Sequence, residues 1–190
     1  AFGAMPQIVQ RHAQRLAWVA LVHHPLWLET GLPAAEAARL REAEAESLRH
    51  ARRVITTSEA TAQAVAAMGV AASQITVVVP GTDSAPLAAG SAAGEPPCLL
   101  CIATLTPRKG HRVLIEALAG LRDIPWRLRC LGSLTMDADC AARIHGAIGA
   151  AGLADRVGLE GEADDAAMDA AYAAADLFVL PSFYEGYGMV

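Results

Sequence analysis

The sequence predicts an α/β protein built on parallel, doubly wound sheets. Short apolar runs alternate with stretches of helical periodicity, and most of these runs end in Gly, Pro or Ser, where a strand has to turn. The chain has 190 residues and is 54% hydrophobic, which is enough for a sizeable core. Alternating strands and helices favour right-handed crossovers in a parallel sheet. Such sheets bind ligands at the carboxyl ends of their strands.

The first half of the chain is expected to contain three strands. The expected elements are a helical segment at 1–15, a buried strand at 16–22, a loop at 26–33, a helix at 34–52, a strand at 54–57, a helix from Ser58 to Gly69 and a strand at 75–79. Ser58 is a typical N-cap. The Glu/Arg run of the helix at 34–52 is interpreted as a solvated face.

A change in composition divides the chain. Residues 84–97 are small, rich in Pro and Gly and without periodicity, which is typical of a linker between domains. We therefore expect one domain at 1–83 and a second at 98–190.

The second half alternates more regularly. The expected elements are a strand starting at Cys98, a helix following Gly110, a strand at 126–131, a helix at 139–151, a strand at 156–159, a helix at 165–175 and a strand at 176–180. Asp164-Asp165 is interpreted as a helix cap rather than as part of a hydrolase carboxylate pair.

Two adjacent cations, Arg108 and Lys109, stand where the first helix of this half begins. Helix N-termini favour anions, so cations there are unfavourable unless an anion binds. Lys109 is the only lysine of the chain. The pattern therefore indicates an anion site; the alternative is a solvated helix start with two surface charges.

Two further groups follow expected strands. Glu185 precedes Gly186 and Gly188, a pattern that allows close backbone approach, and its carboxylate can accept hydrogen bonds from sugar hydroxyls. The alternative is an ordinary glycine-rich turn. His23 and His24 follow the strand at 16–22, where they are either ligand contacts or surface residues of a turn.

Composition excludes several classes of protein. The net charge of −5 and the aromatic content of 5% argue against a nucleic-acid or anionic-membrane surface. No apolar run approaches the roughly 20 residues that span a bilayer, and no signal peptide is visible. The four cysteines are interpreted as buried small hydrophobes, without metal-ligand spacing, in a reducing cytoplasm.

Four motifs in register, and with them a histidine pair after an expected strand, resemble the retaining GT-B glycosyltransferases of family 4. The four motifs are the turn at 77–83, the segment Thr104–Gly110 with its Arg-Lys-Gly, the strand and loop at 175–182, and Glu185-Gly186-Tyr187-Gly188, and the histidine pair is that of His23-His24-Pro25. The resemblance covers most of the chain and implies a GT-B fold with two Rossmann-like domains. Both are expected to be incomplete, with the chain truncated at both ends.

The resemblance also implies a reaction and its residues. A hexosyl group would pass from a UDP- or GDP-sugar, bound mainly by 98–190, to an acceptor hydroxyl on the side of 1–83. Arg108 and Lys109 would hold the diphosphate without a metal, Glu185 would bind the sugar, and His23 or His24 would lie near the reacting centre. The other implied donor contacts are Thr104, Gly132, Ser133, Glu160, Gly161, Gly186, Tyr187, Gly188, Met189 and Val190, with Glu160 near the nucleobase.

The sequence departs from the family pattern at one position of the phosphate loop. Ala103-Thr104 stands where the family often has Gly-Arg, and Arg108 is the candidate substitute. The family's second glutamate is expected beyond Val190. The alternative function is therefore an inactive, nucleotide-sugar-binding GT-B-like protein. A dinucleotide oxidoreductase is disfavoured because no strand-to-helix turn carries G-x-G-x-x-G. Peripheral membrane association and the oligomeric state stay open.

Overall fold

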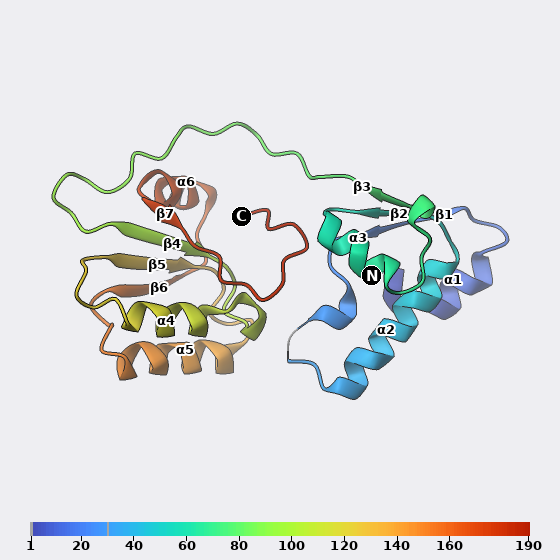
Figure 1. Cartoon of the computed structure of the whole chain (residues 1–190), viewed down its shortest axis with the longest axis horizontal. Helices are drawn as coiled ribbons and strands as arrows, with labels where there is room; N and C mark the ends of the chain where they lie inside the picture. Colours follow the sequence, from blue (N-terminus) through green and yellow to red (C-terminus); the bar gives the residue numbers. More distant parts are fainter. Residues whose placement is uncertain (1, 30) are drawn as a thin grey trace. The chain divides into compact units, whose positions relative to one another are not determined.

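The computed structural model describes residues 2–29 and 31–190, which divide into two compact units (Figure 1). Unit 1 comprises the residues up to Thr82 together with the segment Tyr184–Met189. Unit 2 comprises Asp83–Phe183 and Val190. Each unit contains its own parallel sheet, so the predicted α/β class is confirmed.

Unit 1 contains a three-stranded parallel sheet in the order β1-β2-β3. Its strands are β1 (Trp18–Val22), β2 (Ala51–Thr56) and β3 (Ile75–Val77), and its α-helices are α1 (Pro6–His12), α2 (Ala34–Arg49) and α3 (Glu59–Ala66). Short 3-10 turns lie at Phe2–Ala4, Leu26–Leu28 and Ala72–Gln74. Its core brings together apolar side chains from β1, β2, α2 and α3.

Several predicted boundaries in unit 1 are wrong, and two of them are instructive. Helix α2 ends at Arg49 rather than Arg52, because Ala51 and Arg53 pair with β1. Strand β1 starts at Trp18 and is buried on only one face, since Val19 and Leu21 are 54% and 53% exposed. The backbone hydrogen bonds of a neighbouring strand outweigh helix propensity at the end of α2.

One carboxylate of α2 is not on a solvated face. Glu44 is only 3% exposed, and its carboxylate accepts a hydrogen bond from the Leu26 backbone N–H at 2.9 Å. Burial raises the pKa of Glu44 above its ordinary value, while this hydrogen bond opposes the rise. Glu44 therefore fixes the start of the turn that follows His23-His24-Pro25.

Unit 2 contains a four-stranded parallel sheet in the order β6-β5-β4-β7. Its strands are β4 (Cys98–Ile102), β5 (Arg127–Leu131), β6 (Val157–Gly161) and β7 (Leu177–Phe178), and its α-helices are α4 (His111–Ala119), α5 (Ala138–Ala150) and α6 (Asp165–Ala173). The 3-10 turn Pro107–Lys109 directly precedes Gly110 and α4. The strand predicted at 176–180 is much shorter, because only Leu177 and Phe178 pair with β4.

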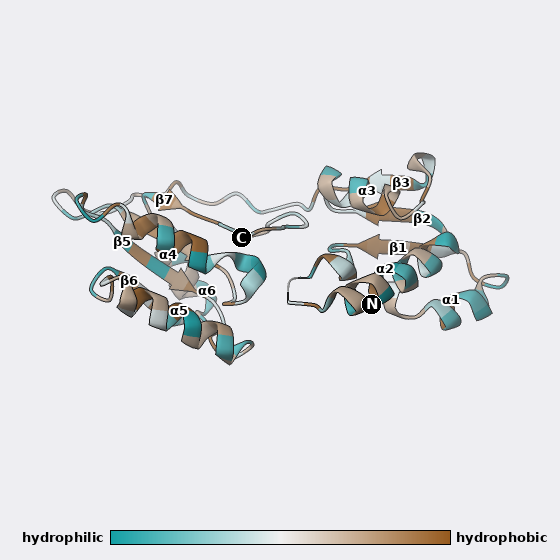
Figure 2. Cartoon of the chain, turned by 60° about the horizontal axis from the view of Figure 1, so that its bottom comes forward, coloured by the Kyte–Doolittle hydropathy of each residue, from teal (hydrophilic) through white to brown (hydrophobic). Residues whose placement is uncertain are grey.

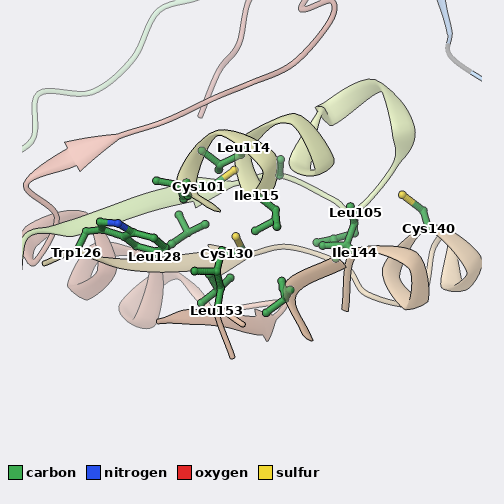
Figure 3. Close-up of a cluster of buried hydrophobic side chains, with 14 residues drawn as sticks. Cys101, Leu105, Leu114, Ile115, Trp126, Leu128, Cys130, Cys140, Ile144 and Leu153 are labelled. Atoms are coloured by element: carbon green, nitrogen blue, oxygen red, sulfur yellow. The ribbon is translucent and has the colours of Figure 1, made fainter. Parts of the chain in front are cut away.

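The sheet of unit 2 is covered on both faces. Helices α4 and α5 pack on one face around side chains such as Cys101 and Leu128, and α6 packs on the other against Leu100 and Ile102 (Figures 1 and 3). Strand β4 is therefore apolar along its whole length, as strands buried on both faces are. The hydropathy colouring in Figure 2 shows apolar stretches in the strands of both units.

Local capping signals were good predictors of helix starts. The Ser58 hydroxyl accepts from the Thr61 N–H at 3.1 Å, and the Asp164 carboxylate accepts from the Ala167 N–H at 2.8 Å. Both interpretations as caps are confirmed. Within the described ranges, no helix combines the length and the apolar character needed to cross a membrane.

The segment at 84–97 contains no helix or strand. Asp176, the residue directly before β7, holds part of this segment in place through its carboxylate. Asp176 accepts hydrogen bonds from the backbone N–H groups of Cys98, at 2.7 Å, and Ser91, at 3.2 Å. Both interactions favour the ionised form and hold the pKa of Asp176 below its ordinary value, the Cys98 bond most strongly. This carboxylate joins the segment to the first residue of β4.

Replacing this carboxylate should produce a pH-dependent loss of stability. Because the pKa of Asp176 is lowered on folding, its stabilisation is present above the pKa of the unfolded chain, about 3.9, and is lost as the pH falls through the lower folded value. We expect Asp176→Ala to lower the melting temperature at pH 7, and the difference from wild type to shrink in acid. The control is Asp155→Ala, in the exposed turn before β6. A difference that does not change with pH would contradict this assignment.

Candidate functional site

The carboxyl ends of three strands in unit 2 form one continuous edge. The loops that leave these strands are joined by backbone hydrogen bonds: Ala103 N–H to Leu131 O at 2.8 Å, Leu105 N–H to Ser133 O at 3.1 Å, and Gly132 N–H to Gly161 O at 2.8 Å. These bonds extend the parallel pairing of β4, β5 and β6 beyond the strands themselves. The predicted positions Thr104, Gly132, Ser133 and Gly161 therefore lie along this edge.

Arg108 and Lys109 lie in a tight turn at the same edge. The 3-10 turn Pro107–Lys109 closes on Gly110, whose φ of 70° is left-handed, and α4 begins at the next residue. Both cationic side chains are half-buried. The first N–H groups of α4 add the positive end of a helix dipole, so the turn concentrates positive charge at one point. We call residues Pro107–Gly110 the cation turn.

The loop that follows β7 lies directly against the cation turn. The Phe183 N–H donates to the Arg108 carbonyl at 2.9 Å. A Cβ on Gly110 would stand 2.1 Å from the Pro181 carbonyl oxygen, so no side chain fits there. The approach of these two loops therefore requires glycine at position 110 for space as well as for its positive φ.

Glu160 is engaged by a neighbouring strand. Its two carboxylate oxygens accept from Nε and an Nη of Arg129, both at 2.7 Å, which is a bidentate pair across β6 and β5. The carboxylate raises the pKa of Arg129 above its ordinary value. Each side chain is about one third exposed. A contact between Glu160 and a nucleobase stays a prediction, and it would have to share or replace this pair.

In unit 1, the predicted histidines contact the segment that contains Glu185. The rings of His24 and Tyr184 meet edge to face, with centroids 5.1 Å apart. The hydroxyl of Thr61, a fully buried residue of α3, lies 3.1 Å from the Tyr184 hydroxyl and donates to the Gly186 carbonyl at 3.4 Å. Thr61 was not singled out from the sequence, although the first turn of a helix after a strand is a position where ligand contacts gather.

Gly186 packs closely against the backbone of His23, which leaves no space for a side chain. A Cβ at Gly186 would lie 2.0 Å from the His23 carbonyl oxygen. His24 Nε2 lies 3.7 Å from the Glu29 carboxylate. The structure thus places His23, His24 and the segment around Glu185 together in unit 1.

The structure therefore divides the predicted site residues between the two units. Unit 2 contains Thr104, Arg108, Lys109, Gly132, Ser133, Glu160, Gly161 and Val190, whereas unit 1 contains His23, His24, Glu185, Gly186, Tyr187, Gly188 and Met189. Gly188 has a φ of 80°, and Met189 is 70% exposed. The Tyr172 hydroxyl of α6 donates to the Val190 carbonyl. The functional roles of these residues stay predictions.

Comparison with models of protein families shows to which family the chain belongs. The family model described as "Glycosyl transferases group 1" matches residues 87–190, which is more than half of the chain. The chain belongs to the group 1 glycosyl transferases. A second model, described as "Glycosyl transferase 4-like domain", matches residues 1–81. The two matched ranges of this group 1 glycosyl transferase chain end and begin on either side of residues 82–86, in the segment that joins its two sheets.

Solved structures share the fold at low sequence identity. HepE from Anabaena, solved in complex with UDP and glucose, is 21% identical with a TM-score of 0.72, and the match covers 99% of this chain and 60% of that one. Sucrose-phosphate synthase from Thermosynechococcus elongatus is 22% identical with a TM-score of 0.74, covering 97% and 49%. The lipopolysaccharide outer core galactosyltransferase WaaB is 16% identical with a TM-score of 0.63, covering 98% and 56%.

The group 1 glycosyl transferase chain thus spans about half to three fifths of the length of these structures. They share its GT-B architecture of parallel α/β units, as the resemblance implied. No curated protein sequence matches the chain.

A side chain at Gly110 should destabilise this edge of unit 2. We expect Gly110→Ala to lower the free energy of unfolding by about 2 kcal/mol or more, because it adds left-handed strain to a clash with Pro181. Gly146→Ala is the matched control: this glycine lies inside α5 with nothing within 4 Å of a new Cβ, and alanine should stabilise the helix by about 0.5–1 kcal/mol. Urea unfolding measures both. Equal effects of the two substitutions would show that the close approach at Gly110 is unimportant.

Proposed function

We propose that this chain takes part in retaining transfer of a hexosyl group from a nucleotide-diphosphate sugar to an acceptor hydroxyl. The products are the new glycoside, the nucleoside diphosphate and a proton. The observation that carries the proposal is the cation turn, which presents Arg108 and Lys109 at the carboxyl edge of β4, beside the first N–H groups of α4. Membership of the group 1 glycosyl transferases supports the same reaction class.

The chemistry follows from charge. As the bond between the sugar and the diphosphate breaks, negative charge grows on the leaving group and the sugar becomes oxocarbenium-like. Two fixed cations and a helix N-terminus stabilise that growing charge most strongly in the transition state, and this function needs no metal ion. Donors of this kind typically contribute about 3–4 kcal/mol to lowering a barrier. In a retaining reaction, the acceptor attacks from the face that the diphosphate leaves, so a donor phosphate oxygen can accept the proton.

The remaining predicted residues take roles around this centre. Glu185 would accept hydrogen bonds from sugar hydroxyls, and the backbone at 186–190, with its two glycines, would approach the sugar and phosphates. His23 and His24 would lie beside the acceptor. HepE has been solved with UDP and glucose and with UDP-glucose, which supports a uridine nucleotide as the first donor to test. The four free thiols are compatible with a cytoplasmic reaction.

A titration of UDP by calorimetry tests the donor site. We expect Lys109→Ala to weaken UDP binding about 10- to 100-fold, because a charge-assisted hydrogen bond to a phosphate is lost. The control is Arg112→Ala, which removes an exposed cation of α4 that pairs with Glu116 at 2.7 Å. It should leave binding within about twofold of wild type.

A transfer assay with UDP-glucose separates the enzyme from the alternative of an inactive nucleotide-sugar-binding protein. Turnover that Lys109→Ala abolishes supports the enzyme, whereas tight binding of UDP without turnover favours the binding protein. Equal UDP affinity in wild type and Lys109→Ala would contradict a diphosphate site at the cation turn.

A further inference from the structure

Two cysteines and a histidine converge inside unit 2, next to the cation turn. Cys101, His111 and Cys130 are 0%, 2% and 1% exposed. One ligand atom from each lies within 4.8 Å of the other two, and Cys101 Sγ lies 3.7 Å from His111 Nε2. Figure 3 shows Cys101 and Cys130 on neighbouring strands beneath α4, with Cys140 further away on α5.

The topology explains why residues so far apart in the sequence meet. Cys101 and Cys130 are register partners in the parallel pair β4 and β5, so their side chains project from the same face of the sheet. His111 is the first residue of α4, which packs on that face. Two central strands and one helix start therefore each contribute one potential ligand.

Apolar packing alone does not account for His111. Its one hydrogen-bonding contact that the structure gives is to the Cys101 thiol, which is a weak partner, and within residues 2–29 and 31–190 its Nδ1 has no hydrogen-bond partner. A buried imidazole in this state costs free energy that a leucine would not.

We propose that Cys101, His111 and Cys130 bind a Zn²⁺ ion. With Zn–S bonds of about 2.3 Å and Zn–N bonds of about 2.0–2.1 Å, a tetrahedral site separates sulfur and nitrogen by about 3.6 Å. The observed 3.7 Å between Cys101 Sγ and His111 Nε2 is close to this value, and the Cys130 ligand atom lies within 4.8 Å of both. Three protein ligands leave one position of the tetrahedron for a small exogenous ligand such as water.

Charge and donor type favour zinc over other ions. Two thiolates and a neutral imidazole carry a charge of −2, so Zn²⁺ gives a neutral complex suited to an apolar core. A monovalent soft cation such as Cu⁺ would leave one net negative charge buried. Mg²⁺ and Ca²⁺ prefer oxygen ligands, and none of the three side chains supplies one.

An ion can approach the site from the helix side. A cavity of about 920 Å³ lies between α4 and α5, and His111 and Cys140 are among its lining residues. Bound zinc would join the first residue of α4 to β4 and β5, directly after the cation turn. Its role is to fix the start of α4, and the inference does not depend on the proposed function.

Metal titration of the reduced, metal-stripped protein tests the site. We expect one equivalent of Zn²⁺ per chain in competition with a chromophoric chelator, and a rise in melting temperature that excess EDTA reverses. Cys130→Ala and His111→Ala should each weaken binding about 100-fold or more. Cys140→Ala is the matched control, because it removes another buried thiol of the same core and should leave the affinity unchanged.

Co²⁺ makes the test independent of how well the variants fold. In the wild-type protein, bound Co²⁺ should show a sulfur-to-cobalt charge-transfer band and the visible spectrum of a four-coordinate ion. The absence of stoichiometric Zn²⁺ binding or of that band in the wild-type protein would overturn the proposal. So would wild-type affinity in Cys130→Ala. UDP titration of the same samples keeps the outcome separate from that of the donor site.

Discussion

Strand β4 has hydrogen-bonded neighbours on both sides and apolar side chains on both faces. It pairs with β5 and β7 in the same direction, and Leu100 and Cys101, which face opposite layers, are both fully buried. This double burial fixes the register of β4, because a slip of one residue would exchange the two faces. Its carboxyl end then fixes the position of Thr104 and of the cation turn. The position of the candidate site in unit 2 thus depends on the packing of β4.

Strand β4 also packs against the start of α4, next to the carboxyl edge of the sheet. Cys101 lies under the first residue of α4, and the cation turn lies immediately before that residue. The residues that follow Arg108 and Lys109 are fixed by close packing. Gly110 is closely approached by Pro181, and His111 is buried against Cys101.

Most elements could be predicted from the sequence because their signals are local. The caps at Ser58 and Asp164 and the strand–turn–helix pattern around Arg108 depend on neighbouring residues, and they were recognised. The end of α2 was misjudged because the hydrogen bonds of Ala51 and Arg53 come from a distant strand. Glu44 was placed on a solvated face for the same reason: its partner, the Leu26 N–H, is far away in the sequence.

In the candidate site, too, local features could be predicted and long-range contacts could not. Parallel strands bring their carboxyl ends to one edge, and hydrogen bonds among 103–105, 131–133 and Gly161 join the loops of three strands there. The segment Tyr184–Met189, which follows the fourth strand, belongs to unit 1 instead. Thr61 and the group of Cys101, His111 and Cys130 were missed. No sequence spacing links Cys101 to Cys130; only the register of β4 against β5 makes them neighbours.

The Arg129–Glu160 pair has a consequence for how ions in solution would influence ligand recognition. A nucleobase that hydrogen-bonds to Glu160 competes with a guanidinium for the same two oxygens, and both side chains are open enough to solvent for dissolved salt to screen their attraction. In the proposed donor site, salt would also screen the attraction between a diphosphate and the cation turn. Raising the ionic strength would weaken the Arg129–Glu160 pair and so make the carboxylate more available to the base. The same change would weaken phosphate binding, so the two ends of one nucleotide would respond in opposite directions.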